Sequence, residues 1–277
     1  MSHRPRRSLS SMVGGVLVVL VAQALAVVGV TATDAATESA AARNKAARGK
    51  AAPLEPNLIA LKAADLYIQH SSAGRKLRFE SGLGNIGRGP IEVRPNQNRP
   101  CPDGQHHATQ VLYRDVDGNR RYRRDVDTDL ARRSAGCMVF HPYHDHWHFE
   151  AASRYTLWKK NAQEPLRVGH RKMSFCLRDS REVPDSYGTF NYPEHYGACS
   201  RYSPQGISIG WVDVYQSYLA GQALKLPARA GDGLYCLQIK VDPTDAIRES
   251  DDADNTSLRA FRLSGDRIRV VPTSRCR

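Results

Sequence analysis

The run His144-Asp145-His146-Trp147-His148 places a histidine at every second position. Side chains of a β-strand alternate between its two faces, so a strand here would turn all three imidazoles to one side. In a helix, the middle ring would point away from the other two. Three convergent imidazoles form a metal site, and imidazole suits copper, zinc, iron and nickel alike. We therefore predict that His144, His146 and His148 bind a transition metal.

Two neighbouring residues lie close enough in sequence to assist this site. Glu150 has the same parity as the three histidines, and a turn at Pro142 would bring His141 round to their side. We expect both residues to support the metal ligands rather than to bind the metal themselves.

The N-terminal segment, residues 1–32, has the pattern of a signal peptide. Arg4, Arg6 and Arg7 precede an apolar stretch from Met12 to Ala32. The Arg6-Arg7 pair is compatible with a twin-arginine signal. An uncleaved membrane anchor is the alternative, because about twenty apolar residues can span a bilayer.

The rest of the chain divides into a linker and one domain. Residues 33–56 are rich in alanine and contain Pro53 and Pro56, which favours a linker or a frayed helix. Residues 57–277 are enough for one domain with a sizeable core.

The chain is strongly basic, with a formal net charge of +12. This charge favours attraction to anionic cell-wall or membrane surfaces. The arginines of residues 120–124 follow Asp117-Gly118, which predicts a hairpin turn leading into a solvated strand. That interpretation and the export signal both argue against nucleic acid as a partner.

Six cysteines lie in the exported part of the chain, and an even number in an oxidising compartment predicts three disulfides. No CxxC spacing suggests a zinc or redox motif. The cysteines are Cys101, Cys137, Cys176, Cys199, Cys236 and Cys276.

Short alternating segments indicate strands at 76–80, 90–93, 155–158 and 235–241. Many short strands separated by Gly, Pro and Asp predict a mostly β fold, a sandwich with long loops and few short helices. One short helix is expected over residues 63–71.

Three blocks, in this order along the chain, resemble the lysyl oxidase family. The segment 141–155 resembles its copper-binding segment, residues 172–179 its block with the cofactor lysine, and residues 205–215 its block with the cofactor tyrosine. Weaker similarity extends from Leu77-Arg78-Phe79 to the acidic stretch that ends at Asn255. The resemblance implies a lysyl oxidase-like β-sandwich.

The same resemblance implies that the three histidines bind copper and that Lys172 and Tyr215 form a lysine tyrosylquinone. Copper and dioxygen can oxidise a phenol, and a deprotonated lysine amine can add to the oxidised ring. Arg171 cannot take this role because its guanidinium stays protonated. Asp213 would share a strand face with Tyr215 and is our candidate general base; the alternative is a solvated carboxylate or the partner of an arginine.

The resemblance also implies a pairing of Cys101 with Cys137 and of Cys176 with Cys199, which leaves Cys236 with Cys276. It further implies a structural calcium in the acidic loop 249–255, completed by the chain near Asn57 and Leu58. The alternative is a polar turn, and the loop lacks EF-hand spacing. The oxygen ligands that calcium prefers would come from Glu249, Asp251, Asp254 and Asn255.

The chain departs from the animal family pattern in two places. Arg154 stands where animal members have a histidine. The role of that histidine is therefore either absent from this chain or taken by His141 or His195. The segment between Lys172 and Tyr215 is also longer.

These observations predict a secreted copper-dependent amine oxidase. It would convert primary amines, either peptidyl lysine or small amines, to aldehydes with dioxygen, releasing ammonia and hydrogen peroxide. One alternative is an exported copper-binding module without catalysis. The other is a zinc hydrolase, for which no partner motif such as HExxH is present.

Overall fold

The computed structural model describes residues 51–160, 166–228 and 230–277, and the side chains of residues 166–172 are not part of this description. The predicted signal peptide, residues 1–32, and most of the predicted linker lie outside the described residues. No helix among the described residues is long and apolar enough to cross a membrane.

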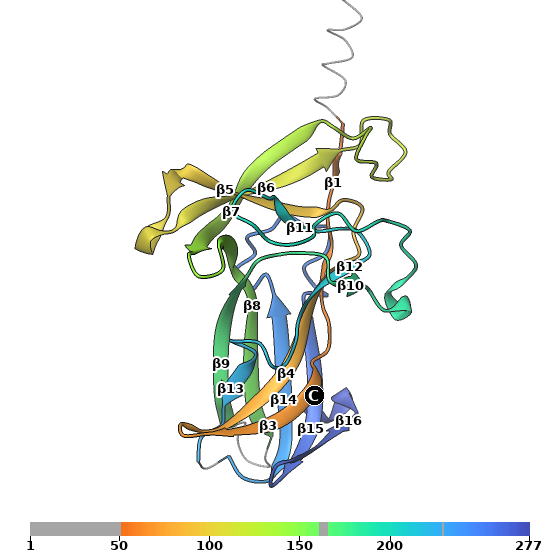
Figure 1. Ribbon diagram of the computed structural model, residues 1–277. Helices are drawn as coiled ribbons and strands as arrows, with labels where there is room; N and C mark the ends of the chain where they lie inside the picture. Colours follow the sequence, from red (N-terminus) through yellow and green to blue (C-terminus); the bar gives the residue numbers. More distant parts are fainter. Residues whose placement is uncertain (1–50, 161–165, 229) are drawn as a thin grey trace, which may run out of the picture. The chain divides into compact units, whose positions relative to one another are not determined.

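The larger of two antiparallel sheets has ten strands in the order β11-β5-β6-β7-β8-β14-β15-β16, with β1 beside β6 and β9 beside β8 (Figure 1). Its strands are β1 (Pro53–Leu54), β5 (Ile91–Pro100), β6 (His106–Arg114), β7 (Leu130–His141), β8 (His146–Lys160), β9 (Leu166–Phe175), β11 (Gln205–Ile207), β14 (Gly233–Val241), β15 (Thr256–Ser264) and β16 (Arg267–Val271).

The second sheet has six strands in the order β10-β12-β4-β13, and β2 and β3 also pair with β4. Its strands are β2 (Leu58–Ala60), β3 (Ala64–Ser71), β4 (Gly74–Asn85), β10 (Arg181–Glu182), β12 (Trp211–Tyr215) and β13 (Ala223–Lys225). The helical elements in the described part of the chain are three short 3-10 turns, η1 (Pro102–Gly104), η2 (Asp185–Tyr187) and η3 (Thr273–Cys276). The prediction of a mostly β fold is confirmed.

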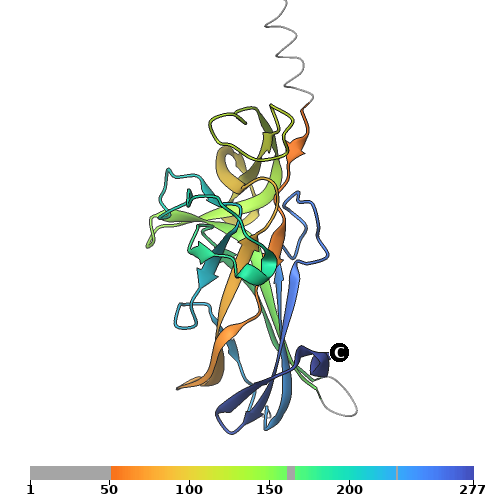
Figure 2. The same ribbon diagram turned by 90° about the vertical axis from the view of Figure 1, so that its right-hand side faces the viewer.

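The two sheets share one apolar core. Phe79 of β4 meets Tyr155 of β8 edge to face, with ring centroids 4.9 Å apart. The Tyr155 hydroxyl lies 2.6 Å from Ser81 Oγ, so the buried phenol keeps a polar partner. Both views show the β3–β4 hairpin running alongside β14 and β15 (Figures 1 and 2).

The alternating segments form strands as predicted. Residues 76–80 lie in β4, residues 155–158 in β8 and residues 235–241 in β14, and the segment 90–93 opens β5. In β14, every second residue from Tyr235 to Val241 is fully buried. The apolar face that the alternation indicated therefore faces the core.

The helix predicted over residues 63–71 is wrong. This segment forms β3, which pairs with β4 through Tyr67 and Arg78. Leu66 and Ile68 pack against the core, which is the period of a strand. Pairing with a long neighbouring strand outweighed the local helix propensity of Ala63-Ala64.

Two further expectations need correction. The arginines of residues 120–124 lie in the loop that joins β6 to β7, and the next strand begins only at Leu130. The predicted linker also extends too far, because β1 pairs with β6 and Leu54 is buried. The domain therefore begins before residue 57.

All three disulfides have the pairing that the family resemblance implied. Each joins segments that are distant in sequence: Cys101 to Cys137, Cys176 to Cys199, and Cys236 to Cys276.

Candidate metal centre and its surroundings

The three histidines cluster at the hairpin between β7 and β8. One ring nitrogen of each lies within 4.8 Å of the others. Only His146 and His148 belong to β8, where alternation puts them on one face. His144 lies in the turn before it, so the expectation of one strand through all three residues is wrong. The turn, with Asp145 at φ +52°, still brings the His144 ring to the other two.

The ring geometry leaves room for a shared ligand. Nε2 of His146 lies 3.0 Å from Nε2 of His148. The His144 ring centroid is 5.3 Å from that of His146 and 5.6 Å from that of His148. Ring nitrogens that converge in this way can donate together to one metal ion.

Burial favours the neutral form of two of these imidazoles, His146 and His148. Burial and, to a smaller extent, the neighbouring histidines together lower the pKa of His148 to about 4. Burial also lowers the pKa of His146. A neutral imidazole offers the lone pair that a metal requires, so the donor set fits a transition metal.

His141 supports this cluster from the last position of β7. Its ring stacks on the His144 ring, with centroids 4.2 Å apart. The expected turn at Pro142 thus brings His141 to the side of the other histidines. The Nδ1 atom of His141 is buried without a hydrogen-bond partner. Glu150, by contrast, is not part of the metal-ligand group that the described residues form.

Arg201 stabilises the turn that carries His144. Arg201 was not identified from the sequence as a residue of this site. Its guanidinium bonds Asp145 Oδ1 at 3.0 and 3.2 Å and lies over the Phe140 ring. The Arg201 carbonyl accepts a hydrogen bond from the indole of Trp147 at 3.2 Å. Because Arg201 lies 56 residues from Asp145, no local pattern indicated this contact.

The predicted cofactor tyrosine, Tyr215, lies beside β9, which pairs with β8. Phe149, one residue after His148, pairs with Phe175 of β9, and the Phe175 ring stacks on Tyr215 at 3.6 Å between centroids. The Tyr215 hydroxyl donates a hydrogen bond to the Cys176 carbonyl at 2.7 Å. These contacts place Tyr215 beside β9 and β8. Phe149 alternates with His146 and His148 along β8, so Tyr215 lies on the side of the strand opposite to those two imidazoles.

Asp213 and Tyr215 affect each other's ionisation on β12. Asp213 is buried, and its Oδ2 has no hydrogen-bond partner. Burial raises the pKa of Asp213 well above its usual range. Burial, followed by the Asp213 charge, raises the pKa of Tyr215. Asp213 is therefore a buried carboxyl beside the predicted cofactor ring rather than a solvated surface group.

Of the predicted cofactor lysine, the structure describes only the backbone. Lys172 stands in β9 opposite Arg154, three residues before Phe175. Arg154 is exposed and donates to the Pro243 carbonyl. His195 is exposed too and does not belong to the histidine group of the described chain.

The acidic loop 249–255 contacts the chain near Asn57, as expected. Glu249 accepts hydrogen bonds from the Leu58 amide at 2.6 Å and from the Asn255 amide group at 2.7 Å. Asp254 accepts one from Asn57 at 3.1 Å. Burial raises the pKa of Glu249 to about 8.

Three oxygen atoms in this loop region stay buried and unpartnered: Oδ1 of Asn57, Asp254 and Asn255. Orphaned oxygens around a buried carboxylate fit a hard cation. Asp251 does not share this environment, because it is exposed and accepts a hydrogen bond from the Ala253 amide.

The fold and the site thus define a mostly β, disulfide-bonded protein with a three-histidine cluster, a half-buried tyrosine at position 215 and a buried carboxyl at position 213. Residues 126–273 match the family model described as Lysyl oxidase. This chain belongs to the lysyl oxidase family.

Curated relatives agree with this assignment over part of their length. Lysyl oxidase homolog 2 of Xenopus tropicalis is 31% identical over 131 residues, which are 47% of this chain and 16% of that protein. Lysyl oxidase homolog 2B of Danio rerio is 32% identical over 132 residues, with the same shares. Lysyl oxidase homolog 4 of Homo sapiens is 29% identical over 131 residues, again with those shares. The match therefore spans about a sixth of each relative.

Proposed function

We propose that this protein is a secreted copper-dependent amine oxidase that converts primary amines to aldehydes, releasing ammonia and hydrogen peroxide. The proposal rests on one observation above all: ring nitrogens of His144, His146 and His148 lie within 4.8 Å of one another. Family membership supports the activity, and the three disulfides are consistent with export to an oxidising compartment.

His144, His146 and His148 would hold the copper. With dioxygen, the bound copper would supply the oxidising power that turns Tyr215, joined to Lys172, into a lysine tyrosylquinone able to take electrons from an amine. The protein's own residues orient this chemistry and move the protons. Phe175 fixes the plane of the Tyr215 ring, and the Cys176 carbonyl fixes its hydroxyl.

Asp213 is the proposed general base. Its Oδ2 is free of hydrogen bonds and would accept the proton from the substrate carbon next to the nitrogen. A raised pKa suits this task, because a more basic carboxylate takes a proton from carbon more readily. Its burial also keeps bulk water from competing.

We further propose a structural calcium ion at Glu249, Asp254 and Asn255, with Asp251 nearby and the Asn57 oxygen completing the site. The unpartnered oxygens support it. The net charge of +12, which falls to +9 once the predicted signal peptide with Arg4, Arg6 and Arg7 is removed, would favour residence at an anionic cell-envelope surface, with peptidyl lysine or small amines as substrates.

A second candidate is a copper-binding module that never forms the quinone. It is favoured by the hydroxyl of Tyr215, which the Cys176 carbonyl already holds, and by the stacked Phe175 ring. Such a protein would bind copper without oxidising amines.

Peptide mapping by mass spectrometry distinguishes the two candidates. Copper-loaded protein, kept in air, should yield the Lys172 and Tyr215 peptides joined by a cross-link, and should release peroxide from a primary amine. Tyr215→Phe should lose both, whereas Tyr202→Phe, at an exposed tyrosine, should retain both. Separate, unmodified peptides from fully loaded protein would instead establish the non-catalytic module.

A further inference from the structure

A second cluster of possible metal ligands lies in the loop between β6 and β7. One carboxylate oxygen each of Asp115, Asp117 and Asp127 lies within 4.8 Å of the others. None of these residues belongs to the histidine centre or to the acidic loop 249–255. Carboxylates this close repel one another unless a positive charge lies between them.

Asp115 supplies the observation that points to a ligand. The residue is 9% exposed, and its carboxyl faces the other two. Its Oδ2 accepts a hydrogen bond from the Arg120 amide at 3.0 Å, but its Oδ1 is buried without any partner. A buried carboxylate oxygen without a donor is costly unless a cation occupies the position.

The loop backbone holds the other carboxylates in place while leaving them acceptor capacity. Asp127 accepts hydrogen bonds from the amides of Val116 at 3.0 Å and of Arg123 at 2.8 Å, one on each oxygen. Asp117 Oδ1 accepts one from the Asn119 amide. Asp117 Oδ2 already accepts from the Asn119 side-chain amide at 2.8 Å and from Arg123, whereas each of the other carboxylate oxygens keeps a lone pair that can face a metal.

The charge balance favours a divalent ion. In the described part of the chain, one carboxylate of this cluster, Asp117, forms an ion pair with Arg123 through Oδ2. Three carboxylates and one guanidinium leave an excess of two negative charges. The Arg123 side chain is about half exposed, so it can move aside without leaving a buried charge behind.

The ligand chemistry and spacing indicate calcium. Asp115 and Asp117 stand at the first and third positions of a turn whose sixth residue, Arg120, has φ +61°. The EF-hand loop likewise takes ligands from positions one and three and makes a sharp turn at position six. Here Asp127 closes the loop one residue later than the EF-hand glutamate. Flexible all-oxygen coordination suits calcium better than magnesium, which demands a strict octahedron.

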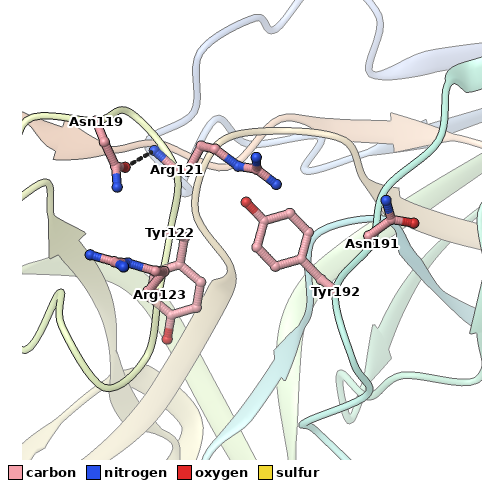
Figure 3. Close-up of a pocket in the computed structure, with 6 residues that line it drawn as sticks. All are labelled: Asn119, Arg121, Tyr122, Arg123, Asn191 and Tyr192. Atoms are coloured by element: carbon pink, nitrogen blue, oxygen red, sulfur yellow. Dashed lines mark hydrogen bonds between the residues drawn. The ribbon is translucent and has the colours of Figure 1, made fainter.

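We propose that Asp115, Asp117 and Asp127 bind a calcium ion that fixes the β6–β7 loop. This loop presents Arg121, Tyr122 and Arg123 to a cavity of about 390 Å³. Asn191 and Tyr192 form the facing wall, and a hydrogen bond from the Arg121 amide to Asn119 Oδ1 shapes the loop side (Figure 3). Calcium would therefore hold one wall of this cavity in position.

Calcium titration of the full protein tests the proposal by stoichiometry. Calorimetry should find two calcium ions per chain, one here and one at Glu249. Asp115→Asn should lose the first, and Glu249→Gln should lose only the second. Asp125→Asn removes the same charge from an exposed position of the same loop and should bind as the wild type does. An Asp115→Asn protein with unchanged stoichiometry and affinity would overturn the proposal.

Limited trypsin digestion tests it without relying on a variant at the site. The loop contains four arginines within residues 120–124, so an open loop offers several cleavage sites. Calcium should slow cleavage there at least tenfold in wild type and in Glu249→Gln alike. Equal cleavage rates with calcium and with chelator in Glu249→Gln would refute the site. Neither readout depends on amine oxidation.

Discussion

The ring of Tyr215 lies on the ring of Phe175, with centroids 3.6 Å apart and planes inclined by 20°. Phe175 is itself paired with Phe149, the residue after His148. This stacking connects the tyrosine that the family resemblance assigns to the cofactor with the strand that carries His146 and His148.

Replacing Phe175 should therefore impair cofactor formation more than folding. Phe175→Leu keeps an apolar side chain but removes the flat surface that orients Tyr215. We expect the yield of the cross-linked peptide to fall severalfold, with about 1–2 kcal/mol lost from the free energy of unfolding. Phe261→Leu, at a buried phenylalanine stacked on Tyr235, is the matched control. It should lose similar stability and keep the full cross-link yield, as urea unfolding and mass spectrometry would show.

The pH profile of amine oxidation should show the titration of the Asp213 carboxyl. A base acts only when it is deprotonated, and burial raises the pKa of Asp213 above the ordinary carboxyl range. Activity should therefore fall as the pH drops through that raised pKa, well above pH 4. Asp213→Asn should lower kcat by about a hundredfold or more and flatten this limb. An Asn variant with the wild-type profile would remove Asp213 from the reaction.

Tyr196 should matter for stability and not for chemistry. Its buried hydroxyl donates to Glu92 at 2.8 Å and accepts from Arg124 at 3.2 Å. Tyr196→Phe should cost about 1–2 kcal/mol of unfolding free energy, because Arg124 loses an acceptor while Glu92 keeps Tyr113 as a donor. Denaturant unfolding measures the cost. Tyr202→Phe, at an 88% exposed tyrosine, should change neither stability nor activity.

The sequence predicted the features that depend on a regular spacing of residue types within one segment. Alternation located β4, β8 and β14, and the histidine spacing located the three-histidine cluster, although His144 lies in a turn. The helix expected at residues 63–71 failed because strand pairing with β4 is a tertiary effect. A local pattern contains no information about the partner strand.

Contacts between distant residues could not be predicted in this way. Arg201 meets Asp145 across 56 positions, and Asn57 meets Asp254 across 197. Only the family resemblance indicated the second contact. The acidic cluster around Asp115 had a visible signal in its spacing, but Asp117-Gly118 was interpreted as a tight hairpin turn, whereas the loop runs from residue 115 to residue 129.

Calcium at the 249–255 loop should stabilise the fold measurably. The Asp115→Asn background isolates this loop from the second proposed site. There, calcium at about a hundred times its Kd should add about 2.7 kcal/mol to the unfolding free energy. Thermal unfolding with calcium and with chelator measures the difference. Glu249→Gln should abolish it, while Glu182→Gln, at an exposed glutamate, should leave it intact.

Arg201 should tune the metal affinity from outside the ligand set. It binds Asp145, the residue between His144 and His146, and its carbonyl holds the Trp147 indole. Arg201→Ala removes the guanidinium and its hydrogen bonds to Asp145 but keeps the backbone carbonyl, so the turn can move and the His144 ring is no longer held toward the other two. Loss of such a supporting residue costs about tenfold or more in metal affinity. Competition with a chelator of known copper affinity would measure the change, and Arg132→Ala, an exposed arginine on the same hairpin, should show none. Equal affinities in the two variants would mean that the histidines are positioned without Arg201.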